Sequence, residues 1–296
     1  MLAEDNKEFN FLELNSFNIK SHSKNESLYI REWKTKKKKV LHHFIILHDI
    51  CDHHGRYELL AQDLWKKFNQ EINITFIDMK GHGLSSGTRS YVENFDEYVD
   101  DLHLILNDYE SINTKKILVG QGLGGLIALS YIQKYENEAK ERISSVVLSN
   151  PLLYLKIDVH VLYEKMLKKI NRYAGKIRFP YRIKGSDLTQ DRIRIESYNS
   201  DPLINHYMSI SLIEEIVRKS NQLLDYSYFL DIPLLMLLSK NDFLVNWQKC
   251  SLFMKGMPKK LANECLYAHS GHDLFNEKNR DKVFNDIYNW ITDSNR

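Results

Sequence analysis

Cysteine, proline and glycine are all scarce in this chain of 296 residues. With only 5 Pro and 12 Gly, it has neither a collagen-like composition nor a long flexible linker. The cysteines Cys51, Cys250 and Cys265 are widely spaced and odd in number. This pattern argues against a disulfide framework and favours a reducing compartment. The fold is therefore expected to depend on a hydrophobic core.

An excess of charge of one sign is also missing. The 41 Lys+Arg nearly balance the 39 Asp+Glu, giving a formal net charge of +2, so we expect no nucleic-acid partner. No stretch approaches the roughly 18–20 apolar residues of a membrane-spanning helix. The segment Met1–Lys20 lacks the apolar core of a signal peptide. The sequence predicts a soluble, cytoplasmic protein.

Short apolar runs alternate with amphipathic stretches along most of the chain. The runs have strand character and the stretches have apolar residues at helical spacing. Strands alternating with helices predict an α/β protein with a mostly parallel sheet and helices on both faces. The expected strands are 40–47, 72–77, 116–119, 143–148, 233–238 and 265–267, and the clearest helices are 57–68, 95–109, 123–134 and 281–290.

One segment interrupts this alternation. Residues 152–226 show helical patterns, such as 159–172 and 211–224, but no convincing strand. An insertion at this point would lie over the carboxyl ends of the strands, where ligands bind in such sheets. We therefore predict a lid at 152–226, a core formed by 27–151 with 227–296, and an N-terminal extension at 1–26.

The turn at Gly120–Gly125, read Gly-Gln-Gly-Leu-Gly-Gly, permits two interpretations. Its glycines fit the dinucleotide-binding pattern G-x-G-x-x-G. They also fit the nucleophile elbow G-x-S-x-G, with Gly122 at the serine position. A nucleotide site needs a carboxylate near the end of the next strand, and the segment Val147–Pro151 has none. The elbow is therefore the favoured interpretation, and a nucleotide-binding module is the weaker one.

Two residues further along the chain support the elbow. Asp242 follows the strand predicted at 233–238, and His272 follows the strand that ends at Tyr267. The order elbow, acid, histidine is that of enzymes in which the acid orients an imidazole and the imidazole activates a serine.

From about Ser27 to Trp290, the chain resembles the monoacylglycerol lipase and lysophospholipase branch of the α/β-hydrolases, which carry a serine aminopeptidase S33-like domain. The motifs that carry the resemblance are His48–Tyr57, Asp78–Gly87, Gly120–Gly125, Tyr198–Ile204 and the surroundings of Asp242 and His272.

The resemblance implies an α/β-hydrolase fold with an inserted helical lid. It implies hydrolysis of an ester of a single-chain acyl lipid or lysophospholipid, without a cofactor or metal. Asp242 would orient His272, His272 would act as the general base, and the backbone amides of Ile50 and Leu123 would bind the oxyanion. Lid residues Ile157, Val161 and Leu162 would face the acyl chain.

The chain departs from the family at two positions. The family elbow reads Gly-His-Ser-Met-Gly-Gly, so Gly122 stands where the nucleophilic serine is expected. The family has His-Gly before the first helix, whereas this chain has His48-Asp49. A carboxylate that faced the site would repel an oxyanion, and the sequence leaves the direction of Asp49 open. Nothing in the spacing of Ser85, Ser86, Ser149, Ser239 or Cys51 indicates a replacement nucleophile.

The histidines at 42, 43, 48, 53 and 54 invite a metal site with Asp49 and Asp52, but their spacing closes no known ligand set, so structural roles are expected. For function, we favour a pseudoenzyme that binds an acyl lipid, or a protein partner at the lid. The alternative is a weak hydrolase in which His272 activates a water in the space that Gly122 leaves. Transient contact with a membrane surface also fits the resemblance.

Overall fold

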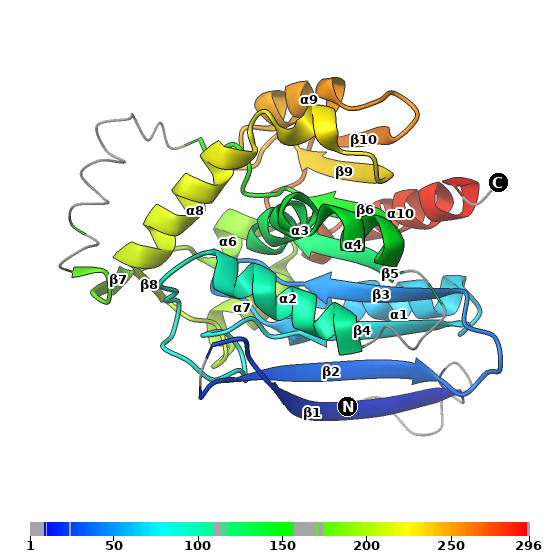
Figure 1. The fold of residues 1–296 in the computed structure, drawn as a ribbon, viewed down its shortest axis with the longest axis horizontal. Coiled ribbons are helices and arrows are strands. Elements are labelled where there is room, and N and C mark those ends of the chain that lie inside the picture. The colour runs from blue at the N-terminus through cyan, green and yellow to red at the C-terminus, as the bar shows by residue number, and fades with distance from the viewer. Residues whose placement is uncertain are drawn as a thin grey trace.

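The computed structural model describes residue 9 and residues 11–23, 25–108, 114, 116–156, 170 and 174–294. Its main elements alternate between strand and helix after the first two strands (Figure 1). The strands are β1 (Leu12–Lys20), β2 (Ser27–Thr35), β3 (His42–Leu47), β4 (Ile72–Ile77), β5 (Lys116–Gln121), β6 (Ile143–Ser149), β7 (Arg178–Pro180), β8 (Tyr207–Ser209), β9 (Leu234–Ser239) and β10 (Ala262–Tyr267).

The helices of these ranges include short 3₁₀ turns beside the α-helices. They are η2 (His54–Tyr57), α1 (Glu58–Lys67), α2 (Asp96–Asp108), α3 (Leu123–Lys134), α4 (Glu136–Arg142), α6 (Gly185–Leu188), α7 (Arg192–Ser200), α8 (Ile210–Leu223), η3 (Tyr226–Phe229), α9 (Trp247–Gly256), η4 (Leu274–Asn276) and α10 (Arg280–Ser294).

The central sheet has eight strands in the order β1-β2-β4-β3-β5-β6-β9-β10. From β4 to β10 neighbouring strands are parallel, whereas β2 pairs antiparallel with β4 and with β1. The predicted parallel sheet is thereby confirmed. The sequence analysis did not predict β1 and β2. Because β1 pairs with β2 along its whole length, residues 12–20 of the expected N-terminal extension belong to the sheet.

Apolar residues of the strands point to both faces of the sheet and build one core on each. On β3, Ile45 and Leu47 pack with α2 and α3, while Phe44 and Ile46 pack with α1 and α10. This alternation follows from the two-residue repeat of a strand. A parallel strand covered on both faces reads as a continuous apolar run, which is why these strands could be identified from the sequence.

The segment between β6 and β9 lies beyond one end of the sheet (Figure 1). It contains α6, α7 and α8, with α8 packed on α3, and the short antiparallel pair β7–β8, which was not predicted. The predicted helix at 159–172 and the residues Ile157, Val161 and Leu162 lie outside the described residues, apart from Ile170. No helix within the described ranges has the length and apolar character needed to cross a bilayer.

Candidate active site

Gly122 forms the sharp turn between β5 and α3. Its φ of +50° and ψ of −110° lie outside the regions open to most side chains, and glycine adopts them without the strain that a Cβ would bring. Its amide donates to the carbonyl of Ser149 at 3.0 Å, which fixes the turn against β6. The backbone thus has the tight strand–turn–helix shape of a nucleophile elbow.

The side chain of Asp49 occupies the space beside Gly122. A Cβ built on Gly122 would lie 1.7 Å from Asp49 Oδ1, far inside van der Waals contact. The same Oδ1 accepts hydrogen bonds from the amides of Ile50 at 2.7 Å and Leu123 at 2.9 Å. These are the two amides that the family resemblance assigned to the oxyanion. The direction of Asp49, which the sequence left open, is therefore into the site.

His272 lies between two carboxylates. Its Nδ1 is 2.6 Å from Asp242 Oδ2, and its Nε2 is 2.8 Å from Asp49 Oδ2. Asp242 is held in place because its Oδ1 accepts from the amides of Leu244 at 2.7 Å and Val245 at 3.0 Å. The predicted residues Gly122, Asp242 and His272 thus come together, with Asp49 added at the nucleophile side of the imidazole.

The charges in this group decide which nitrogen of His272 carries a proton. Burial alone would lower the pKa of His272, but the carboxylates of Asp242 and Asp49 outweigh it and hold that pKa well above 6.5. Burial would raise the pKa of Asp49, yet the charge and hydrogen bonds of His272 lower it below 3.8. At neutral pH the group is an imidazolium between two carboxylates, so both ring nitrogens donate.

A buried polar network supports Asp49 from behind. The Asp49 amide donates to the Tyr57 hydroxyl at 2.9 Å, and this hydroxyl donates to Asp52 Oδ2 at 3.1 Å. The Arg56 guanidinium pairs with Asp52 at 3.1 Å and with Asp273 at 2.5 Å. Because Asp273 directly follows His272, Arg56 ties the Asp49 loop to the histidine loop. Sequence reasoning did not find Asp52, Arg56 or Asp273 as members of the site.

Gln121, which stands where the family has histidine, joins the same network. Its Nε2 donates to Asp273 Oδ1 at 3.1 Å. The amide side chain of Gln121 therefore connects the elbow to the histidine loop, at a position where the family has an imidazole. This contact could not be foreseen, because the two residues are far apart in the sequence.

Other histidines of the loop have hydrogen-bonding roles. His48 Nδ1 donates to the carbonyl of Asp49 at 2.6 Å, and its Nε2 accepts from the amide of Met79 at 2.9 Å. His53 pairs with Asp201 at 2.9 Å. His54 pairs with Asp78 at the same distance. Burial lowers the pKa of His48 to about 4, so its ring is neutral. Across the ranges described, no three His, Cys, Asp or Glu side chains are grouped to hold a metal ion.

The insertion packs on the loops that carry these residues. The amide of Asn205 donates to the carbonyl of Cys51 at 3.0 Å, and Arg56 lies over the ring of Tyr198 at 4.8 Å. The site is consequently closed: Asp49 is 6% exposed and His272 0%.

Of the groups considered as substitute nucleophiles, Ser149 Oγ is buried without a hydrogen-bond partner among the described residues, and the others bond elsewhere. Ser85 donates to the carbonyl of Asp78, and Ser239 to that of Ser270. The Cys51 thiol is 3.5 Å from Ser90 Oγ, and burial raises its pKa to about 12. A buried thiol of this kind is a poor nucleophile. Both His272 nitrogens are engaged by carboxylates, so no hydroxyl here is activated by His272.

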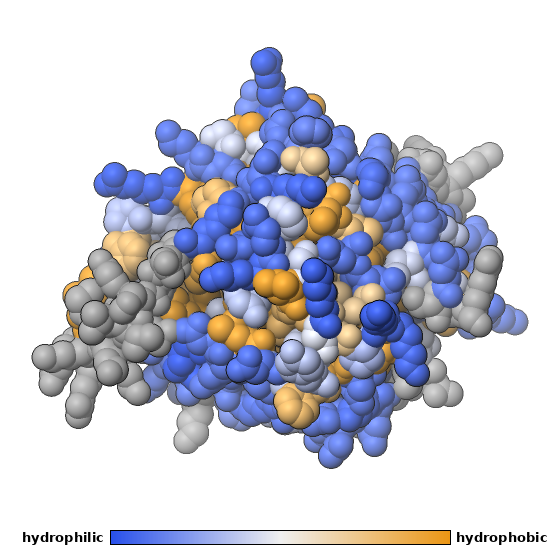
Figure 2. All heavy atoms as spheres, turned by 90° about the horizontal axis from the view of Figure 1, so that it is seen from above, coloured by the Kyte–Doolittle hydropathy of each residue, from blue (hydrophilic) through white to orange (hydrophobic). Residues whose placement is uncertain are grey.

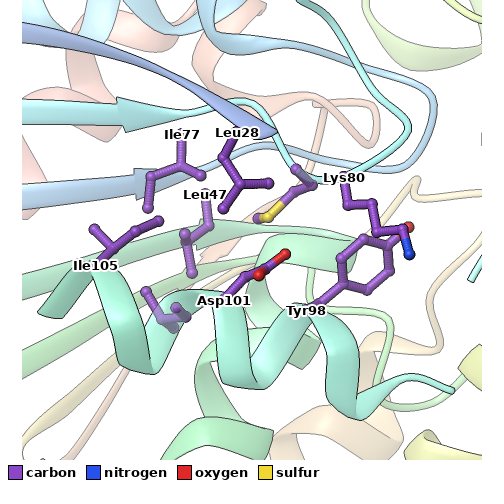
Figure 3. Close-up of a pocket in the computed structure, with 9 residues that line it drawn as sticks. Leu28, Leu47, Ile77, Lys80, Tyr98, Asp101 and Ile105 are labelled. Carbon is purple, nitrogen blue, oxygen red and sulfur yellow. The ribbon is translucent and has the colours of Figure 1, made fainter. Parts of the chain in front are cut away.

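A separate cavity lies between α2 and the sheet, lined by Leu28, Leu47 and Ile77 among others (Figure 3). It offers about 10 Å³ of room for water, which is at the lower limit for a single molecule. Asp101 points into it from α2. Its carboxylate accepts from Ser21 Oγ at 2.8 Å and from the amide of His22 at 2.6 Å. This cavity is a packing feature of the fold and is too small for a ligand.

Asp101 gives a testable pH dependence of stability. Burial raises its pKa from 3.8 to about 6 in the folded protein. The folded state therefore binds the proton more tightly, and the stability contributed by the neutral carboxyl is lost as pH rises from about 4 to 6. Asp101→Asn stays neutral at all these pH values. The difference in free energy of unfolding between this variant and the unaltered chain should therefore shift in favour of the variant by up to about 3 kcal/mol from pH 4 to pH 8. Denaturant melts of both proteins at pH 4 and pH 8 test this, with the exposed Asp281→Asn as the control. If Asp101→Asn and the unaltered chain differ by the same free energy at both pH values, the prediction is wrong.

The chain matches a known protein family and several characterised relatives. The family model described as "Serine aminopeptidase, S33" matches residues 38–279. The chain is 24% identical over 255 residues to phospholipase YtpA of Bacillus subtilis, covering 85% of this chain and 95% of the relative. It is 26% identical over 277 residues to the monoglyceride lipase of Rattus norvegicus, covering 90% and 86%.

Solved structures share the same fold. A soluble variant of the monoglyceride lipase of Saccharomyces cerevisiae, crystallised with a substrate analog, superposes with a TM-score of 0.81 at 18% identity, covering 96% of each chain. The monoacylglycerol lipase of Paleococcus ferrophilus gives a TM-score of 0.77 at 18% identity, covering 90% of this chain and 99% of that one.

Proposed function

Because this chain belongs to the serine aminopeptidase S33 family of α/β-hydrolases, we propose that it is a non-hydrolytic member that binds a single-chain acyl lipid. The observation that carries the proposal is the position of Asp49. Its carboxylate lies in the space of the missing nucleophile, on both oxyanion amides and on the base nitrogen of His272.

Each of the three parts needed for ester hydrolysis is missing or already engaged. Gly122 provides no nucleophile. The amides of Ile50 and Leu123 already bind Asp49, so an oxyanion would have to displace a carboxylate. His272 Nε2 donates to Asp49 and so has no lone pair with which to accept a proton. In this proposal Asp242, His272, Gly122, Ile50 and Leu123 keep the positions of catalytic groups without the reaction.

A weak hydrolase that uses a water at Gly122 is disfavoured. That mechanism requires an open space beside the glycine, and the Asp49 carboxyl fills it. It also requires a neutral imidazole, whereas the two carboxylates favour the imidazolium. A nucleotide-binding module is disfavoured as well, because the first amide of α3 is engaged by Asp49 rather than free for a phosphate.

The ligand class is inferred from the relatives and from the charge of the site. The relatives named above are phospholipases and monoglyceride lipases, whose names specify acyl-lipid substrates. In this chain the Asp49 carboxylate, whose pKa is lowered by His272, already occupies the amides of Ile50 and Leu123, which disfavours a fatty-acid anion. We therefore propose a neutral or zwitterionic single-chain lipid beneath the lid at 152–226, over a core of 27–151 and 227–296. A protein partner at the lid is the alternative.

The first experiment measures turnover of ester substrates. The unaltered chain is expected to hydrolyse neither a nitrophenyl ester nor a monoacylglycerol measurably, and to remain unlabelled by a fluorophosphonate, because it lacks an activated hydroxyl. Initial rates are compared with those of His272→Gln. Turnover that is lost in His272→Gln would identify a working hydrolase and contradict the proposal.

The second experiment measures binding of single-chain lipids. A monoacylglycerol or lysophosphatidylcholine present at about 100 times its dissociation constant should stabilise the fold by about 2.7 kcal/mol, because it binds the folded chain alone. Thermal melts with these lipids and with a fatty acid of equal chain length measure this. If none of them raises the melting temperature, the lipid role is wrong and a partner at the lid is favoured.

A further inference from the structure

Three strongly exposed apolar side chains lie on η3, where the lid segment ends, and on α9, which packs against η3. Tyr228 and Phe229 of η3 are 74% and 66% exposed, and Leu252 of α9 is 61% exposed. η3 packs on the end of α9: a Cβ built on Gly256 would lie 2.2 Å from Ser227 Oγ and 3.6 Å from the ring of Tyr228. Leu252 is one helical turn before Gly256, so its side chain lies on the same side of α9 as Tyr228, and Phe229 follows Tyr228 directly in η3.

Four exposed lysines belong to the same helix, α9, and the turn after it. Lys249 and Lys255 are exposed on α9, and Lys259 and Lys260 directly after it. Within the described part of the chain, none of the four pairs with a carboxylate. The nearest acids in sequence are Asp225 before η3, Asp231 after it, which pairs with Lys140 at 2.8 Å, and Glu264, whose carboxylate accepts from Ser251 Oγ at 2.5 Å. We call this surface the α9 patch: Tyr228, Phe229 and Leu252 with Lys249, Lys255, Lys259 and Lys260.

Figure 2 looks down on the side of the molecule that carries α9 and shows apolar residues set among hydrophilic ones. The α9 patch has a net positive charge and its apolar side chains project outward. Aromatic and aliphatic tips that project between cations are the features of surfaces that lie in a membrane interface. From them we infer that the α9 patch docks the protein on an anionic lipid bilayer.

The type of cation distinguishes a bilayer from a protein partner. Lysine is depleted at protein–protein interfaces, where arginine is enriched, and the four cations here are all lysines. A lysine stem can lie along the apolar boundary while its ammonium group reaches anionic headgroups. The inference does not depend on the Asp49 site, which lies under the lid, and each can fail without the other.

The test is cosedimentation of the full chain with vesicles. We expect binding to phosphatidylcholine vesicles that contain about 30% phosphatidylserine, and at least tenfold weaker binding to pure phosphatidylcholine. Because each lysine near an anionic surface contributes about a factor of five, the variant Lys255→Gln/Lys259→Gln/Lys260→Gln should bind about 100-fold more weakly. Phe229→Ser/Leu252→Ser should lose at least tenfold. High salt should abolish the lysine-dependent part.

Matched controls change the same residue types elsewhere. Lys36→Gln/Lys38→Gln/Lys39→Gln removes three exposed lysines before β3, and Ile193→Ser removes an apolar side chain that is 68% exposed on α7. Both should bind like the unaltered chain, and all variants should keep its melting temperature. Equal binding to both vesicle types, equal losses in the controls, or a dimer in ultracentrifugation that only the patch variants dissolve would overturn the inference.

Discussion

The double variant Asp49→Gly/Gly122→Ser should hydrolyse a short nitrophenyl ester at least about 10³-fold faster than the unaltered chain, because a complete triad and a free oxyanion hole contribute far more than this factor. Gly122→Ser alone should stay inactive. A side chain at 122 would meet Asp49 Oδ1 at 1.7 Å, so the serine can enter only if Asp49 is displaced. Since the three nearest atoms to that Cβ all belong to Asp49, the double variant has the room that the single variant lacks.

Stability separates the two variants as well. Gly122→Ser should unfold at a lower denaturant concentration than the double variant. Its free energy of unfolding should be about 1–3 kcal/mol lower, because it retains the steric conflict. A third change, His272→Ala, should remove the activity of the double variant and shows whether the triad is responsible. Activity in Gly122→Ser alone, or an inactive but folded double variant, would show that Asp49 does not block the site as we describe.

The second large effect concerns the imidazolium between two buried carboxylates. His272→Ala should cost about 3–5 kcal/mol in the free energy of unfolding near pH 6, because it leaves Asp49 and Asp242 buried without their shared cation. Asp49→Ala should cost less, since the pair of Asp242 with His272 remains. Chemical denaturation of the three proteins measures both differences, and equal losses would argue against a shared cation.

The pH dependence of this loss has a definite sign. The folded-state pKa of His272 lies well above 6.5, so its contribution is complete below 6.5 and is lost as pH rises through the folded value. The folded-state pKa of Asp49 lies below 3.8, so its contribution is complete above 3.8 and is lost as pH falls through the folded value. The difference between the unaltered chain and His272→Ala should therefore be largest between about pH 4 and 6.5 and shrink at higher pH. A difference that grows toward pH 9 would contradict the assignment of charges.

Much of the fold could be predicted, and the reason lies in burial. Strands such as β4 and β9 are buried along their whole length, so most of their residues are apolar. β1 and β2 carry charged and amide residues among their apolar ones and are half exposed, so their sequences do not differ clearly from those of loops. The residues of β7 and β8 form only three-residue strands, which is too short for any periodicity to be visible.

The site was predictable in position but not in detail. Gly122, Asp242 and His272 follow strands whose ends meet at one edge of the sheet, and this order can be read from the sequence. The direction of Asp49 depends on a side-chain torsion and on partners 74 and 223 residues away. The expected space for a water at Gly122 was wrong for the same reason. No local signal specifies such contacts, because they form only when the loops are brought together.

The contact between Asp49 and position 122 also constrains how hydrolytic activity could arise in this chain by substitution. Removing the carboxylate first leaves an elbow without a nucleophile, and restoring the serine first places it against Asp49 Oδ1. Neither single substitution offers selection any gain in turnover. If the proposed function is correct, both changes are needed together, so substitutions made one at a time are expected to leave the chain without hydrolytic activity.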